Sequence, residues 1–319
     1  MASIFSGIDL YAGLRAGAAV RRRESGLAAG GSLAGGGAGP VAARGRAGAA
    51  PKVLVFDSGV GGLSVQREIA TRLPGARFCY VADDAGFPYG AWAEDALTAR
   101  VVEIITGLCA REKPDAVVIA CNTASTLVLP ALRAALEVPV VGTVPAIKPA
   151  VAATRSGLVS VLATPGTVAR DYTRALINTH GHGAEVTLVG SARLAGLAEA
   201  RLRGEAPDEA EMRAEMAPAF VTHRDGRRTD VVVLACTHYP FLADMFVRLA
   251  PWPVHWIDPA PAIARRVADV LQLAPDAPAF RAPENDAGPR GEVIFTSGRA
   301  ASGALAAVLS ALRLAPAAA

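Results

Sequence analysis

DAVVIACNT at residues 115–123 reappears in altered form as DVVVLACTH at residues 230–238. In each stretch an aspartate precedes a run of apolar, mostly β-branched residues, and a cysteine with two polar successors follows it. Short apolar runs of this kind are typical of strands buried inside a parallel sheet. Because the two stretches match position by position, we expect two structurally related halves with Cys121 and Cys236 at equivalent strand ends.

Other apolar runs follow the same pattern and alternate with Ala-, Leu- and Arg-rich stretches of helical spacing. They are VLVF (53–56), FCYVA (78–82), VPVVG (138–142), LVSVLA (158–163), EVTLV (185–189) and VHWI (254–257). A second internal pair, VLVFDSG (53–59) and VSVLATPG (159–166), runs from a strand into a polar, glycine-containing turn. Strands that alternate with helices indicate an α/β fold built on parallel sheets.

Charge and hydropathy exclude two classes of partner. Residues 1–50 hold six arginines against Asp9 and Glu24 and so carry +4, which leaves −1 of the net charge of +3 for the rest of the chain. A nucleic-acid-binding domain carries a basic patch, so we expect no nucleic-acid partner. The most apolar stretch, residues 301–312, is shorter than the roughly 18 residues of a membrane-spanning helix. We therefore expect no membrane association and interpret this stretch as a terminal helix packed on the fold.

Residues 1–50 consist largely of glycine and alanine, which leaves too little large apolar surface to offset the entropy of ordering. We interpret them as a disordered low-complexity extension; an over-long gene start and, less favoured, a transit peptide are the alternatives.

The cysteines, Cys79, Cys109, Cys121 and Cys236, form neither a CxxC pair nor a zinc-site spacing. We expect reduced thiols, no metal and a cytoplasmic location.

Two cysteines at equivalent strand ends point to one reaction in particular. Ligands of parallel α/β sheets bind beyond the carboxyl ends of the strands, and a helix that begins there lowers a thiol pKa. Inversion of an α-carbon needs a thiolate on one face and a thiol on the other, with Asn122, Thr123, Thr237 and His238 as donors to the substrate carboxylate. His238 is also placed to act as a general acid or to hold a thiolate. The alternative is that both cysteines are small buried apolar residues.

Two turns are expected to frame this site. FDSGVGG (56–62) places Asp57 and Ser58 at a strand end, and DDAGFPYG (83–90) brings Tyr89 and Gly90. A nucleotide-binding loop is the rival interpretation of the first turn, although it lacks the P-loop and dinucleotide patterns; a plain turn accounts equally well for the second. Pyridoxal phosphate would need a lysine, and of the three lysines only Lys148 is a candidate, so we expect no cofactor.

The sequence resembles the glutamate racemase family within the aspartate/glutamate racemase superfamily. The matching stretches, in family order, are FDSGVGGLSV, YVADDAGFPYG, IACNTAS, PAIKPA, LATPGTV and ACTHYPFL. The resemblance implies two pseudosymmetric flavodoxin-like parallel-sheet domains with the active site between them. We expect the first α/β domain to comprise residues 51–148 and 258–319, and the second residues 149–257.

The resemblance also implies an activity: cofactor-independent interconversion of L- and D-glutamate, which supplies D-glutamate for peptidoglycan. Cys121 takes the proton from the D-enantiomer and Cys236 from the L-enantiomer, while Asp57 and His238 tune the cysteines nearest them. The substrate-binding residues that it implies are Asp57, Ser58, Tyr89, Gly90, Asn122, Thr123, Thr164, Thr167, Thr237 and His238.

Some features leave alternatives open. Ser125 and His238 resemble the glutamate branch, but an aspartate or hydantoin racemase remains a rival, as does a non-catalytic ligand- or protein-binding relative. Some family members carry an acid where this chain has Pro165, so no third catalytic carboxylate is inferred. Asp84 and Pro259 replace commoner Thr and Ser. The oligomeric state is left open, with a homodimer as one option, and so are allosteric control and gyrase binding.

Overall fold

The computed structural model describes residues 50–273, 277–281, 288–301 and 303–317. Apart from Ala50, the predicted disordered extension lies outside the described residues.

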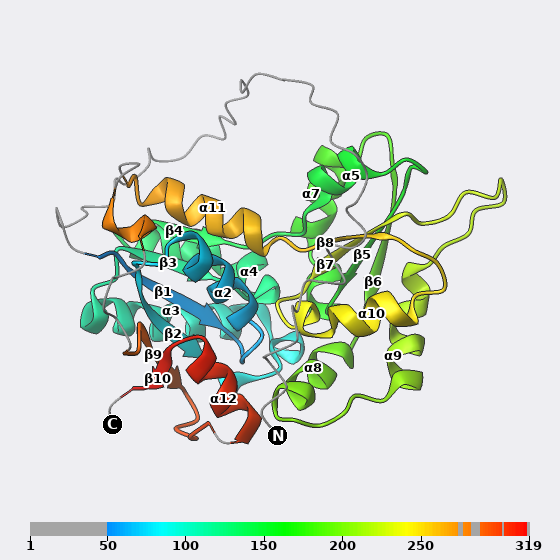
Figure 1. Cartoon of the computed structure of the whole chain (residues 1–319). Coiled ribbons are helices and arrows are strands. Elements are labelled where there is room, and N and C mark those ends of the chain that lie inside the picture. Colours follow the sequence, from blue (N-terminus) through cyan, green and yellow to red (C-terminus); the bar gives the residue numbers. More distant parts are fainter. Residues whose placement is uncertain (1–49, 274–276, 282–287, 302, 318–319) are drawn as a thin grey trace.

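Two parallel sheets form the framework of the molecule (Figure 1). All strand pairs within them are parallel. In spatial order the first sheet contains β10 (Leu314–Pro316), β9 (Gly291–Phe295), β2 (Arg77–Ala82), β1 (Lys52–Asp57), β3 (Ala116–Ile119) and β4 (Val140–Gly142). The second contains β6 (Glu185–Gly190), β5 (Leu158–Ala163), β7 (Val231–Ala235) and β8 (His255–Ile257). The predicted α/β class is confirmed, whereas β9 and β10 were not predicted.

The internal repeat of the sequence is visible in the strand order. The order β2-β1-β3-β4 of the first sheet corresponds to β6-β5-β7-β8 of the second. The repeated aspartates, Asp115 and Asp230, accept equivalent backbone hydrogen bonds in the two halves. Asp115 accepts a hydrogen bond from the backbone N–H of Lys52 at the start of β1, and Asp230 accepts from the N–H groups of Arg155 and Ser156 just before β5. Each aspartate therefore aligns the beginnings of two neighbouring strands.

Helices cover both faces of each sheet, as parallel strands require. They are α2 (Leu63–Arg72), α3 (Glu94–Glu112), α4 (Asn122–Ala135), α5 (Ile147–Ala153), α6 (Pro165–Val168), α7 (Asp171–His180), α8 (Leu194–Leu202), α9 (Glu209–Met216), α10 (Ala243–Leu249), α11 (Ala260–Val270) and α12 (Gly303–Ala311). α11 shows why they pack: Ala260, Ile263, Ala264, Val267 and Ala268 share one buried face at helical spacing.

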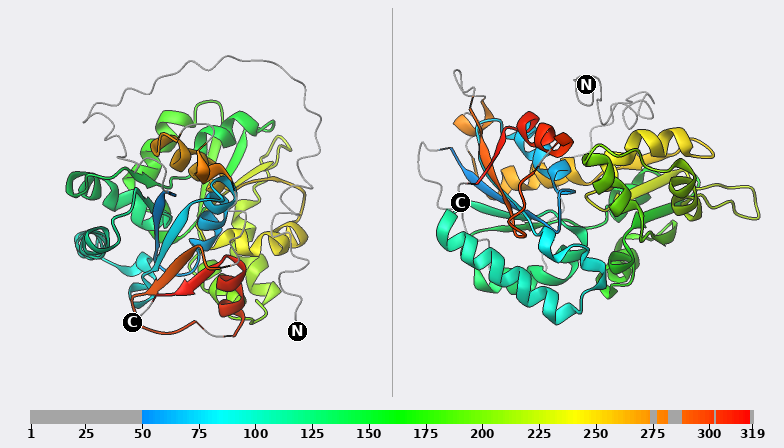
Figure 2. Two further views of the ribbon diagram at one scale, coloured as in Figure 1. Left: turned by 60° about the vertical axis from the view of Figure 1, so that its left-hand side comes forward. Right: turned by 90° about the horizontal axis from the view of Figure 1, so that it is seen from below.

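The apolar core is divided by the sheets. Residues of α3 and α4 pack on one face of the first sheet, and residues of α5 and α7 pack on one face of the second. The remaining faces, with α2, α11 and α12 in one half and α8, α9 and α10 in the other, belong to a single continuous cluster. The two halves are thus joined by a shared core, although they form distinct lobes in the views of Figure 2.

Two smaller expectations concern the chain beyond β8. The terminal helix predicted for residues 301–312 is observed as α12. The chain returns to the first sheet after β8, through β9 and β10, but the division into domains at residues 51–148, 149–257 and 258–319 stays a prediction. Among the described residues, no helix is both long enough and apolar enough to cross a membrane.

Candidate active site

The two repeated cysteines lie where the strands of the two halves end. Cys121 follows β3 and is the residue at the N-cap of α4. Cys236 follows β7 directly and precedes a short 3-10 helix, Tyr239–Leu242. Both are almost buried, with 5% and 6% exposure, and both line one cavity of about 350 Å³. The structure therefore brings together two thiols that are far apart in sequence.

Most of the predicted site residues line this cavity as well. Those on its wall are Ser58, Tyr89, Gly90, Cys121, Asn122, Thr123, Thr164, Cys236, Thr237 and His238. Asp57 and Thr167 are fully buried behind it. Asp57 reaches the wall through Thr237, whose hydroxyl donates to its carboxylate at 3.1 Å. Thr167 lies in a cluster of hydroxyl groups with Thr123 at 3.3 Å and Thr164 at 3.1 Å.

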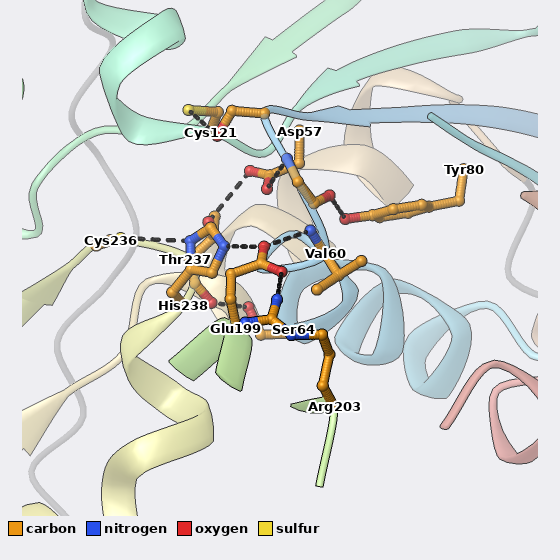
Figure 3. A network of polar contacts seen from close by, with 12 residues as sticks. Asp57, Val60, Ser64, Tyr80, Cys121, Glu199, Arg203, Cys236, Thr237 and His238 are labelled. Atoms are coloured by element: carbon orange, nitrogen blue, oxygen red, sulfur yellow. Dashed lines mark hydrogen bonds and ion pairs between the residues drawn. The ribbon is translucent and has the colours of Figure 1, made fainter. Parts of the chain in front are cut away.

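Cys236 is part of a chain of three polar side chains (Figure 3). Its Sγ lies 3.7 Å from Nδ1 of His238. The other ring nitrogen, Nε2, lies 2.8 Å from Oε1 of Glu199 on α8. The same oxygen accepts a hydrogen bond of 3.1 Å from the backbone N–H of Val60, and Arg203 one turn along α8 lies 3.6 Å from the other oxygen. The imidazole is thus held between a thiol and an anchored carboxylate.

This arrangement favours a charged imidazole. Burial of His238 opposes protonation, but contacts with Cys236 and Glu199 outweigh it and raise the pKa of His238 well above its ordinary value. Burial of Glu199 likewise opposes its ionisation, yet the hydrogen bond and charge of His238 hold its pKa below the usual range. Both shifts favour a His238 cation beside Cys236.

Cys121 has different surroundings. Its Sγ lies 3.6 Å from the hydroxyl of Ser58. Burial and the charge of the nearby Asp57 raise the pKa of Cys121 to about 12. The helix effect expected from the sequence is present, since the backbone N–H of Ala124 acts to lower this pKa. It is outweighed, so the expectation of a lowered thiol pKa at Cys121 was wrong.

Asp57 lies at the end of β1, between the two cysteine environments. Besides the contact with Thr237, its carboxylate accepts a hydrogen bond of 3.1 Å from the backbone N–H of Gly59. Burial raises the pKa of Asp57, although the charge of His238 and these hydrogen bonds act in the opposite direction. A carboxyl group with a raised pKa can hold a proton close to the reacting groups.

The glycines after Asp57 allow the two halves to approach. A Cβ on Gly61 would overlap the imidazole of His238, and a Cβ on Gly59 would meet the carboxylate of Glu199. Among residues 57–62 only Ser58 lines the cavity. The glycines thus make room for side chains of the other half, which accounts for them without a phosphate ligand.

Asn122 provides a further indication of a ligand site. It is 3% exposed, it lines the cavity, and neither its Oδ1 nor its Nδ2 has a hydrogen-bond partner in the structure. Buried amide groups are nearly always paired, so a polar ligand in the cavity would supply what Asn122 lacks.

Comparisons with known proteins agree with this geometry. A family model described as Asp/Glu/Hydantoin racemase matches residues 64–267. A glutamate racemase of Brucella anthropi is 62% identical over 221 residues, which span 69% of this chain and 79% of that protein. One of Brucella canis is 57% identical over 234 residues, 73% of this chain and 84% of that protein. The chain belongs to the Asp/Glu/hydantoin racemase family.

Solved structures place it with the glutamate racemases of this family. The Escherichia coli glutamate racemase in complex with L-glutamate and the activator UDP-MurNAc-ala has a TM-score of 0.72 and 40% identity, covering 84% of this chain and 97% of that one. The enzyme from Aquifex pyrophilus has a TM-score of 0.60 and 26% identity, covering 82% and 94%. The resemblance to the glutamate racemase family, an isomerase family, is confirmed.

Sequence reasoning from the family motifs missed one residue of the charged network. Glu199 belongs to no motif and lies in the Ala- and Leu-rich helix α8, which also contributes Ala195 and Gly196 to the cavity wall. A signal was available, because Glu199 shares a helix face with Ala195 and with the buried Leu202. A lone acid on an apolar helix face calls for a buried partner.

The residues that separate this chain from other family members lie at varied distances from the cavity. Ser125 is buried and bridges the carbonyl of Ile119 and the N–H of Thr143. Pro165 lines the cavity, whereas Pro259 is the residue before α11. Asp84 accepts a backbone hydrogen bond of 2.9 Å from Ser297. Ser125 therefore bears on specificity only through the position of α4.

Proposed function

We propose that this protein interconverts L- and D-glutamate by a two-base mechanism, in which one of Cys236 and Cys121 removes the α-proton on one face of the substrate and the other gives its own proton to the opposite face. The observation that carries the proposal is the placement of two thiols from equivalent strand ends on the wall of one cavity. A racemase needs an acid and a base on opposite sides of one carbon, and a pseudosymmetric pair of strand ends is suited to supply them.

In the direction from L- to D-glutamate, Cys236 acts as the base. We assign it this role because the imidazole of His238 lies beside its sulfur and Glu199 keeps that imidazole oriented. The thiolate removes the α-proton, and the Cys121 thiol gives its own proton to the opposite face. The raised pKa of Cys121 keeps it protonated, and thus ready as an acid, near neutral pH.

After one turnover Cys236 holds a proton and Cys121 is a thiolate, which is the form that D-glutamate requires. Asp57 helps this form to exist, because proton uptake by Asp57 removes the negative charge that otherwise raises the pKa of Cys121. The raised pKa of Asp57 itself favours that proton uptake. Release of the proton taken up by Asp57 and return of the proton from Cys236 to Cys121 complete the cycle.

Polar groups on the cavity wall hold the substrate. We assign the α-carboxylate and ammonium to Ser58, Asn122, Thr123 and Thr237, because the unpaired amide of Asn122 is available to such a ligand. Oriented donors to the carboxylate also stabilise the carbanion that forms when the α-proton leaves. A lysine Schiff base is not supported at this site, since none of the three lysines of the chain lies on the cavity wall.

The product serves peptidoglycan synthesis, a role that the family implies. We propose the cytoplasm as the location, because four free cysteines stay reduced in such a compartment.

The first test is incubation with L-glutamate, and separately with D-glutamate, in deuterated buffer without pyridoxal phosphate. Circular dichroism reports inversion, and NMR reports exchange at the α-carbon. We expect inversion by the native protein and its loss in Cys121→Ser and in Cys236→Ser. Preference for aspartate or a hydantoin in a substrate panel would shift the assignment to another branch of the family, and binding without exchange would indicate a non-catalytic relative.

A further inference from the structure

One segment of the cavity wall is continuous in sequence. Phe87, Pro88, Tyr89, Gly90 and Ala91 all line the cavity, and they belong to the loop between β2 and α3. Phe87 also packs on His238, with ring centroids 5.7 Å apart. The position of this loop therefore bears on the shape of the site and on the setting of the imidazole.

Asp83, at the start of the loop, is buried and accepts hydrogen bonds from several side chains. Its carboxylate accepts two hydrogen bonds from the guanidinium of Arg100 on α3, at 2.6 and 2.7 Å. It also accepts the phenol hydrogen bond of Tyr89 and one of 2.5 Å from the hydroxyl of Thr296. Burial opposes ionisation of Asp83, but these donors hold its pKa below the ordinary value. An ionised, fully buried carboxylate with four donors is a strong and directional anchor.

One of these four hydrogen bonds, the one from Thr296, comes from the C-terminal part of the chain. Thr296 follows β9, and its backbone N–H donates to the carbonyl of Ala82 at 3.0 Å. Its hydroxyl also accepts a hydrogen bond of 3.3 Å from the N–H of Ala85. The next residue, Ser297, donates both its N–H and its hydroxyl to Asp84. The loop after β9 is thus fastened to the first residues of the loop after β2.

We propose that Thr296 and Ser297 act with Asp83 and Asp84 as a positioning clamp for the substrate pocket. The clamp residues do not touch the cavity. They act through Tyr89, whose phenol is fixed by Asp83, and through the backbone that leads to Gly90. The family match ends at residue 267, so the proposal gives a role in the reaction to a segment beyond it. The expected effect on racemisation rests on the proposed function, whereas the expected effect on the order of the loop does not.

A second interaction shows how the clamp reaches the far side of the loop. Trp92 donates its indole N–H to the carbonyl of Gly86 at 2.9 Å, and the guanidinium of Arg100 lies 5.5 Å from the centre of the Trp92 ring. Arg100 therefore joins Asp83 at the start of the loop to Trp92 at its end. Loss of one donor to Asp83 should loosen the loop without unfolding α3 or the sheet.

The test compares Thr296→Val, which removes the hydroxyl at nearly constant volume, with Thr296→Ser, which keeps it. Thr179→Val is the matched control, because Thr179 is an exposed helical threonine outside the cavity wall. Two readouts are taken: hydrogen–deuterium exchange of peptides that cover residues 83–92, and steady-state racemisation of both glutamate enantiomers. We expect Thr296→Val to raise KM by about three- to tenfold with a smaller change in kcat, which is within the range for loss of one ordinary hydrogen bond, because the effect reaches the pocket only through the loop.

Exchange in residues 83–92 should rise in Thr296→Val and return to the native level in Thr296→Ser, with β5 and β7 unchanged. Native exchange and native KM in Thr296→Val would overturn the clamp, as would failure of Thr296→Ser to restore them. A uniform rise in exchange across the whole protein would also overturn it. If Thr296→Val fails to fold, Ser297→Ala must show the same local rise in exchange. If the native protein does not racemise glutamate, the exchange result alone decides the effect on the order of the loop.

Discussion

Cys121 and Cys236 hold equivalent places in the two halves, but their surroundings differ. Beside Cys236 lies the His238–Glu199 pair, in which the imidazole favours its cationic form. Beside Cys121 lie a serine hydroxyl and the charge of Asp57, which favour a thiol. The difference starts in the repeat itself, where Thr123 stands at the position matched by His238. A repeated fold can thus place two equal groups while unrepeated residues give them different neighbours.

The largest expected effect comes from removing either thiol. Cys121→Ala and Cys236→Ala should each lower racemisation by a factor on the order of 10²–10⁴, the contribution of a positioned acid or base. Residual α-deuterium incorporation should then be one-sided, from L-glutamate in Cys121→Ala and from D-glutamate in Cys236→Ala. NMR in deuterated buffer measures this, with Cys109→Ala on α3 as the control. Equal residual exchange from both enantiomers in both variants would contradict separate roles.

His238→Asn should affect one proton transfer more than the other. Because the racemic mixture is the equilibrium state, kcat/KM must fall equally in both directions, by roughly 10²-fold for loss of an acid–base partner. The deuterium isotope effect should become larger with α-deuterated L-glutamate and smaller with the D-enantiomer, since abstraction by Cys236 becomes the slow step. His255→Asn, at an exposed position on β8, should leave both isotope effects unchanged. Equal changes for the two enantiomers would show that His238 serves both cysteines.

Glu199→Gln tests the contribution of the carboxylate to the His238 environment, and we expect a smaller effect than in His238→Asn. Removal of this carboxylate takes away a charge and a hydrogen bond that raise the pKa of His238. The His238 cation should therefore be lost at lower pH, and the alkaline limb of kcat/KM should move to lower pH. At pH 9 we expect activity about tenfold below the native protein, which corresponds to one unit of displacement. Glu205→Gln, at an exposed position, should retain the native pH profile. If the alkaline limb of kcat/KM does not move in Glu199→Gln, the titration that limits activity at high pH is not that of His238.

The smallest effect should be a pH-dependent gain in stability in Asp57→Asn. The folded-state pKa of Asp57 is raised above its ordinary value of 3.8, so ionisation lowers native stability as pH rises from that value through the folded pKa. Asparagine has no such titration. The free energy of unfolding of Asp57→Asn relative to the native protein, measured by thermal denaturation, should therefore increase by about 1–3 kcal/mol between pH 4 and pH 8. Asp269→Asn, at an exposed position, is the control; a constant difference across this range would show that Asp57 titrates normally.

The sequence predicted those parts of the fold and site that follow local pattern. The predicted strands are short apolar runs, several of them fully buried, such as β5 and β7, and residues that adjoin a repeated motif, such as Asn122 and Thr237, lie on the cavity wall as expected. β9 and β10 were not predicted from the sequence. β9 is only partly buried at a sheet position near the edge, and β10 is a three-residue edge strand that contains a proline.

Contacts between distant segments could not be predicted in the same way. Glu199 meets His238 only because the glycines at 59 and 61 let the two halves approach, and Thr296 meets Asp83 only because β9 adds to the edge of β2. The net direction of the Cys121 pKa depends on burial and on Asp57. Neither the burial of Cys121 nor its distance from Asp57 can be inferred from the CNTAS motif.

The order of strands in the first sheet has a consequence for biosynthesis. All four strands of the second sheet lie between residues 158 and 257, whereas β9 and β10 of the first lie after residue 290. During translation the second sheet can be complete while β2 still presents an open edge, which is a surface prone to pairing with other chains. Pairing with β9 closes that edge, so a ribosome that stops short of β9 releases a chain with both cysteines but an unprotected sheet.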